Sequence, residues 1–163
     1  MIDPFEVMSA REWDSLLGDL ADESLMRVML TDREGGVLKT HGKRNELCER
    51  IREDRNCLTA VCSQTNVVML EAARTTLLPV VEECEAGMLR LVIPVVRGGI
   101  LRFQVTACGR LAHGAEVETF LLSKLLDMEE DDVTHLARSV TLVARRYVQK
   151  LGERFRERLN EPA

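Results

Sequence analysis

The feature that most constrains the fold is a set of three apolar segments late in the first two thirds of the chain. Residues 77–84, 88–97 and 100–108 are each rich in aliphatic and β-branched side chains. The dipeptide Gly98-Gly99 separates the last two segments, and a two-residue glycine loop is typical of a tight β-hairpin. The sequence therefore predicts three consecutive antiparallel strands.

Alternation along the last two predicted strands gives the sheet two different faces. One face is continuously apolar and carries Leu89, Leu91, Ile93, Val95, Leu101, Phe103, Val105 and Ala107. The other face is mixed and carries Arg90, Gln104, Thr106 and Cys108. Because successive side chains of a strand point to opposite faces, the mixed set is displayed together. We expect Arg90, Gln104 and Thr106 to bind a small polar ligand, or else this face to lie open to solvent.

The N-terminal part of the chain predicts a helix followed by a hairpin. Ser9 and Glu12 form the S-x-x-E pattern of a capping box, and apolar residues at helical spacing follow over residues 10–22. Residues 25–31 and 36–41 are short apolar runs around a Gly-Gly pair, which favours a tight turn between two strands.

Helical periodicity accounts for most of the remaining chain. Residues 44–54 and 57–74 predict two helices between the hairpin and the three strands, and residues 115–128 predict a third. Apolar residues then recur every three or four positions over 130–159, which predicts one long helix. We expect this helix to pair with a second copy as a coiled coil, or to pack on the chain's own sheet.

Together these elements predict one α+β domain over residues 1–163. The expected fold is PAS-like or GAF-like: an antiparallel sheet with a helical insert and long N- and C-terminal flanking helices. Its core would span about residues 10–128, and the long C-terminal helix about residues 130–159.

Four cysteines, Cys48, Cys57, Cys62 and Cys84, follow the spacing C-x8-C-x4-C-x21-C. Four thiolates suit tetrahedral Zn²⁺ or an iron–sulfur cluster, and the lack of a closely spaced cysteine pair favours the cluster. Cys108 could replace Cys57 as the fourth ligand if its strand neighbours that of Cys84. The alternatives are that the cysteines are small buried hydrophobic residues, or that two of them form a reversible disulfide.

Charge and hydropathy exclude several classes of protein. The net charge of −5 argues against nucleic-acid binding, which usually requires a basic surface. No segment approaches the roughly 20 apolar residues of a membrane-spanning helix, and the N-terminus lacks the pattern of a signal peptide. We therefore expect a cytoplasmic protein without membrane contact, in a compartment where stable disulfides are rare.

Motifs of catalysis are missing from the sequence. It contains no phosphate-binding glycine loop and no nucleophile elbow, and its histidines, His41, His113 and His135, are isolated. We expect that the protein is not an enzyme.

The cysteine region resembles the PocR sensory domain, a PAS-like ligand-binding module of prokaryotic signalling proteins. Cys48 in LCERIRE, Cys62 fourteen residues later and Cys84 match the three cysteines of that family. Gly87, Pro94 and the segment VVRGGILRFQV follow at the expected positions, so that the resemblance covers roughly residues 10 to 150.

Two positions depart from the family pattern. Glu85 stands where the family commonly has histidine, and the acidic pair Glu82-Glu83 precedes Cys84 where an aromatic residue is often found. The resemblance implies recognition of small hydrocarbon derivatives such as diols. Because of these two departures, the ligand of typical family members does not carry over directly to this chain.

The sequence as a whole predicts a sensory module. It would bind a small ligand or a metal or iron–sulfur centre at the cysteines and relay its state through helices or a dimer interface. The expected partners are a second copy, bound through the C-terminal helix, and a separate signalling output protein. The alternative is a protein-interaction or dimerisation domain with buried structural cysteines and no cofactor.

Overall fold

The computed structural model describes residues 2–160 and is built around one twisted sheet. The strands are β1 (Arg27–Thr31), β2 (Val37–His41), β3 (Val80–Glu83), β4 (Leu89–Arg97), β5 (Ile100–Ala112) and β6 (Leu142–Val143). The helices are α1 (Pro4–Val7), α2 (Ala10–Ser24), α3 (Glu46–Glu53), α4 (Arg55–Leu58), α5 (Gln64–Thr76), α6 (Thr119–Leu126), α7 (Glu130–Ala137) and α8 (Arg145–Asn160), and a π-helical turn, Thr59–Ser63, joins α4 to α5.

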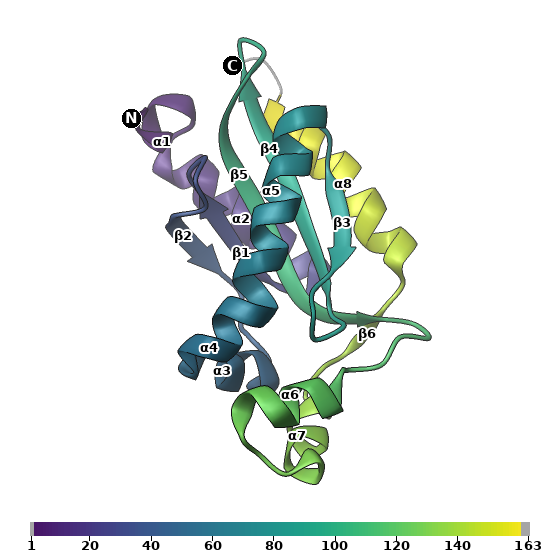
Figure 1. The fold of residues 1–163 in the computed structure, drawn as a ribbon. Coiled ribbons are helices and arrows are strands. Elements are labelled where there is room, and N and C mark those ends of the chain that lie inside the picture. Colours follow the sequence, from purple (N-terminus) through teal and green to yellow (C-terminus); the bar gives the residue numbers. More distant parts are fainter. Residues whose placement is uncertain (1, 161–163) are drawn as a thin grey trace.

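The sheet confirms the predicted α+β fold. Its strand order is β2-β1-β5-β4-β3, all antiparallel neighbours, and β6 pairs with the end of β5. Helix α5 covers one face of this sheet, and α2 and α8 cover the other (Figure 1). The hairpins predicted around the Gly-Gly pairs are β1–β2 and β4–β5, so that turn chemistry located both of them correctly.

The predicted apolar face forms the main core beneath α2 and α8. Ser9 caps α2 through the expected capping box with Glu12. Trp13 is fully buried, and its ring lies edge-on to Phe103 with centroids 6.5 Å apart. The indole nitrogen of Trp13 donates to the carbonyl of Pro4 at 2.9 Å, which satisfies its polar atom. This face is therefore a packed interior.

Helix α8 lies close against the sheet at Gly152. A Cβ atom added there would lie 2.8 Å from Cδ1 of Leu91 and 3.2 Å from Cβ of Pro79. Glycine inside a helix costs up to about 1 kcal/mol relative to alanine, so an intrahelical glycine needs a reason. Here the reason is the contact between α8 and the sheet.

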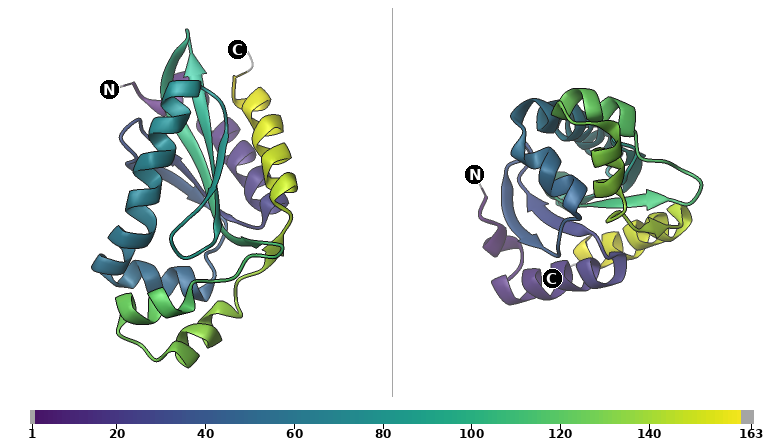
Figure 2. Two further views of the ribbon diagram at one scale, coloured as in Figure 1. Left: turned by 45° about the vertical axis from the view of Figure 1, so that its right-hand side comes forward. Right: turned by 90° about the horizontal axis from the view of Figure 1, so that it is seen from below.

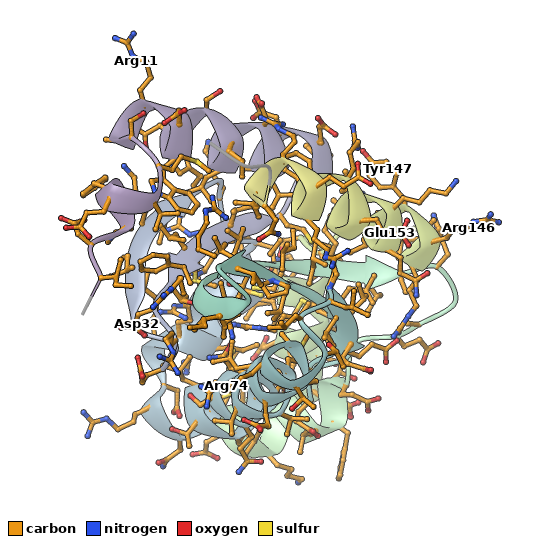
Figure 3. All side chains as sticks on the ribbon, turned by 90° about the horizontal axis from the view of Figure 1, so that it is seen from above. Arg11, Asp32, Arg74, Arg146, Tyr147 and Glu153 are labelled. Carbon is orange, nitrogen blue, oxygen red and sulfur yellow. The ribbon has the colours of Figure 1, made fainter. Side chains whose placement is uncertain are left out.

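This contact gives a first prediction. Gly152→Ala is expected to lower the free energy of unfolding by about 1 kcal/mol, since overpacking costs about 1–3 kcal/mol and outweighs the gain in helix propensity. Urea denaturation measures the difference. The control is Glu153→Ala at the exposed neighbouring position (Figure 3), where the change should stay within about 0.5 kcal/mol. A more stable Gly152→Ala would contradict the proposed tight contact.

The prediction of one helix over residues 130–159 is wrong. Helix α7 ends at Ala137, Leu142–Val143 pair in parallel with the end of β5, and α8 begins at Arg145. The residues between the two helices are largely β-branched or apolar, and they satisfy the backbone of β5: the amide of Leu111 donates to the carbonyl of Thr141 at 2.9 Å. Apolar residues recur throughout 130–159 because α7, β6 and α8 each bury one side against the rest of the chain.

The apolar stripe of α8 is used within the chain. Its buried residues are Val148, Leu151, Gly152, Phe155 and Leu159, and they belong with the core beneath the sheet, apart from any second copy. The alternative packing predicted for this helix, on its own sheet, is therefore the one observed. A homodimer stays a prediction without the coiled coil that suggested it.

A second, smaller apolar cluster lies at the lower end of the molecule. Helices α6 and α7 stack there against α3 and α4, below the main sheet (Figure 2). No helix within residues 2–160 has the length and apolar character required to cross a membrane.

Candidate functional site

The mixed face of the sheet is enclosed. Helix α5 lies across it and α3 and α4 lie at its lower end, so that the three helices form a roof (Figure 1). Gln104 and Thr106 are fully buried, and Arg90 is 7% exposed. The expectation that this face could lie open to solvent is therefore wrong. The sequence could not show this, because a roof supplied by helices some 15 to 60 residues away leaves no local pattern in the strands.

Polar side chains fix the roof above the sheet. Asn45 caps α3 by accepting from the amide of Cys48 at 2.7 Å, and its side-chain nitrogen donates to the carbonyl of Gly109 at 2.8 Å. On the other side, Arg90 donates to the side-chain oxygen of Asn66 at 2.7 Å. Both ends of the roof are thus tied to β5 and β4 through hydrogen bonds that bury polar atoms.

The π-helical turn Thr59–Ser63 lies in this roof and carries Cys62. A π-turn inserts an extra residue into a helix, and such turns occur often at functional sites. Here it joins α4 to α5 within residues 57–74, where the sequence predicted one continuous helix. The turn places Cys62 at the cavity described below.

Four of the five cysteines converge between the roof and the sheet. The thiols of Cys48, Cys62, Cys84 and Cys108 each interact electrostatically with the other three. The sulfur of Cys48 also lies 3.7 Å from that of Met88. The three cysteines that carry the resemblance thus come together, and Cys108 is the fourth member of this thiol cluster.

Cys57 lies apart from the thiol cluster. It is fully buried in the apolar cluster of α3, α6 and α7, and its amide donates to the cap residue Asp54 at 2.8 Å. The charges that act on its thiol are those of Asp54 and Arg50, and no other cysteine is among them. Of the two predicted choices for a fourth cysteine, the structure brings Cys108 to the others.

Burial governs the ionisation of these thiols. It raises the pKa of Cys62 to about 11, with Cys108 and Cys84 adding to the shift. It also raises the pKa of Cys48 and of Cys84, again with a contribution from Cys108. Burial and Asp54 raise the pKa of Cys57 to about 11. These thiols are protonated at neutral pH, and protonated thiols are weak nucleophiles.

The thiol cluster is not a preformed metal centre. Within residues 2–160, no group of three or more His, Cys, Asp or Glu side chains is arranged to hold a metal ion. Of the four cysteines predicted to bind zinc or an iron–sulfur cluster, Cys48, Cys62 and Cys84 come together and Cys57 does not. Their arrangement lacks the geometry that either group requires.

A cavity of about 220 Å³ lies between the sheet and the roof. The sheet side includes Arg27, Met29, Thr31, Arg90 and Cys108, and the roof side includes Arg44, Cys48, Arg52, Cys62 and Asn66. Ligand sites for drug-sized molecules occupy about 300–1,000 Å³, so this cavity suits a smaller molecule. It lies on the face where the sequence placed a ligand.

Of the predicted ligand-binding residues, Arg90 lines this cavity. Gln104 and Thr106 lie on the same face, beneath the roof and outside the cavity lining. Sequence reasoning missed Arg27, which the β1–β5 register places directly beside Cys108. The signal was weak, because the pairing of β1 with β5 joins strands more than 70 residues apart in the chain.

Comparison with family models identifies the family that the cysteine pattern resembles. The family described as "Sensory domain found in PocR" matches residues 6–160. A solved structure of an IcIR transcriptional regulator from Alicyclobacillus acidocaldarius is 13% identical, with a TM-score of 0.34, covering 94% of this chain and 69% of that one. Pseudomonas aeruginosa HmgR is 12% identical, with a TM-score of 0.36, covering 98% and 72%. The comparison with curated proteins gives no match.

Proposed function

The chain belongs to the family of sensory domains found in PocR, and from this premise we propose that it senses a small ligand in the cavity beside the thiol cluster. The observation that carries the proposal is the cavity between the sheet and the roof. It is bounded by β1, β4 and β5 below and by α3, the π-helical turn and α5 above. A bound molecule would contact elements from most of the chain at once.

The two faces of β4 offer a route for the signal. Arg90 points into the cavity, and the next residue, Leu91, lies under Gly152 of α8. Because β4 is a single rigid element, a ligand that moves Arg90 would also move the floor on which α8 rests. We propose that α8 carries the response to a signalling output protein or to a second copy.

A non-catalytic role accords with the chemistry of the site. Catalytic thiols are usually activated by a lowered pKa, whereas burial raises the pKa of Cys48, Cys62 and Cys84. The thiol cluster is therefore better suited to binding than to nucleophilic attack.

Thermal denaturation with a panel of probes tests the proposal. We expect at least one of 1,3-propanediol, malonate, inorganic phosphate and Zn²⁺ to raise the melting temperature, since ligands that bind only the folded state stabilise it. Cys108→Phe would fill the cavity floor and abolish the shift, whereas Thr134→Phe on the exposed surface of α7 would retain it. A panel without effect on the wild type would count against these ligand classes.

Binding of zinc or an iron–sulfur cluster is the second candidate, and the mutual interaction of four thiols favours it. It requires the thiols to rearrange and lose their protons on binding. We expect Cys62→Ser to lose any metal that anaerobically purified protein carries, and Cys57→Ser to retain it. Metal analysis and the visible absorption spectrum measure this occupancy. Full metal occupancy in Cys62→Ser would show that the thiol cluster does not bind the metal. A wild-type protein that carries no metal and responds to no ligand would favour the alternative of a protein-interaction domain.

A further inference from the structure

The cavity floor carries two arginines on either side of a cysteine. Arg27 of β1 and Arg90 of β4 are both paired directly with Cys108 of β5. Directly paired residues of antiparallel strands point to the same face, so the three side chains form one row across the sheet. Two strand spacings of about 4.8 Å separate the arginines by about 10 Å at the backbone, a distance that their long side chains can close around a small molecule.

Both arginines have a buried donor without a partner. Arg90 donates from one terminal nitrogen to Asn66, and Arg27 donates from one to the carbonyl of Gly42, but Nε of each is buried with no acceptor in the described part of the chain. A buried donor left unpaired costs about 1–3 kcal/mol, more when it is charged. Such groups in a cavity wall are sites for an acceptor from outside the chain.

All charged side chains that line the cavity are arginines. Arg44, in the loop before α3, and Arg52 of α3 line the roof, and none of the described residues that line the cavity is Asp or Glu. Glu49, which does not line the cavity, pairs with Arg44 at 3.6 Å. This local excess of positive charge contrasts with the net charge of −5 for the whole chain. Burial, followed by the charge of Arg44, lowers the pKa of Arg27, as expected for cations gathered in one place.

We propose that the cavity binds a small molecule bearing a carboxylate or another oxyanion, with Arg27 and Arg90 as its charged contacts. Guanidinium groups present planar pairs of donors that match the oxygens of carboxylate and phosphate. Cys48 and Cys62, whose raised pKa keeps their thiols neutral, also line the cavity and do not oppose the negative charge. This inference rests on the proposed function and names the chemical class of its ligand.

Calorimetric titration of the full chain at constant ionic strength tests it. The probes are malonate, inorganic phosphate and, as a neutral molecule of similar length to malonate, 1,3-propanediol. We expect malonate or phosphate to bind and 1,3-propanediol to produce no heat. Malonate alone would indicate an organic acid, and phosphate alone an inorganic or phosphorylated ligand.

Charge-removing variants locate the binding. Arg90→Gln and Arg27→Gln should each weaken anion binding at least about tenfold, because a hydrogen bond to a charged group is worth about 1.5–3 kcal/mol. The matched control is Arg146→Gln, which removes an arginine that projects outward from α8 (Figure 3) and should leave affinity unchanged. Should Arg90→Gln fail to fold, the half-buried Arg27 supplies the same test. Hydrogen exchange of the wild type should also show slower exchange in β1, β4 and β5 with the bound anion.

The opposite outcomes are distinct. Binding of 1,3-propanediol without either anion would overturn the inference and leave the proposed ligand-sensing function intact. Anion binding that Arg146→Gln weakens as much as Arg27→Gln would place the anion on the surface and overturn the inference as well. If none of the three probes binds, the inference is overturned as well. The proposed function would then depend on whether Zn²⁺ raises the melting temperature.

Discussion

Raising the pH from about 8 to about 11 is expected to lower the free energy of unfolding of the metal-free protein by several kcal/mol. The cause is the buried thiols. Burial raises the pKa of Cys62 from 9.0 to about 11, and each pKa unit corresponds to about 1.4 kcal/mol. Cys62 alone thus accounts for about 2–3 kcal/mol, and the raised pKa values of Cys48, Cys57 and Cys84 act in the same direction.

The direction of this pH dependence follows from the order in which the two states lose protons. The unfolded chain releases its thiol protons near pH 9.0, while the folded chain retains that of Cys62 to about pH 11. The stabilisation from neutral thiols is therefore complete below about pH 9 and disappears as the pH rises through the folded pKa. Below neutral pH these thiols contribute no pH dependence.

Urea denaturation at a series of pH values measures the effect. Cys62→Ser should show a shallower alkaline loss than the wild type, and both proteins share the titration of their lysines and tyrosine. Bound zinc or an iron–sulfur cluster would hold the thiols as thiolates and also reduce the loss. Equal slopes in metal-free wild type and metal-free Cys62→Ser would show that this thiol is exposed to water in solution.

The sheet could be predicted from sequence because its signals are local. Two glycine pairs fixed the hairpins, and alternation over 88–97 and 100–108 separated the apolar face from the mixed one. The capping box at Ser9 likewise located the start of α2. Each of these signals depends on residues within a few positions of one another.

The site was harder to predict because it depends on distant pairings. Spacing suggested Cys57 as the fourth cysteine, since it lies between Cys48 and Cys62 in the sequence. The structure selects Cys108 instead, because it lies on the face of β5 that α3 and α5 cover, whereas α4 turns Cys57 toward α6 and α7. Arg27 enters the site only through the pairing of β1 with β5.

Periodicity misled at the C-terminus for a related reason. The short strand Leu142–Val143 presents one buried and one exposed residue, a pattern that fits either a strand or a helical stripe over so few positions. Only the backbone acceptors needed by the end of β5 distinguish the two structures, and these belong to another part of the chain.

Gln104 combines full burial with an amide that has no partner. Neither its side-chain nitrogen nor its oxygen has a hydrogen-bond partner in the described structure, although it lies at the centre of the mixed face. We expect Gln104→Met, a substitution that nearly conserves volume, to raise the free energy of unfolding by about 1–3 kcal/mol. The gain comes from removing two polar groups that lose their hydrogen bonds to water on folding.

Urea denaturation of Gln104→Met beside Gln149→Met separates burial from composition. Gln149 is exposed on α8, so its substitution should change stability by less than about 0.5 kcal/mol. A stabilised Gln104→Met that has lost the response to every probe would mean that the amide serves the ligand at the expense of stability, as functional sites often do. A destabilised variant would mean that ordered water satisfies the amide, since its removal would then break hydrogen bonds that already exist.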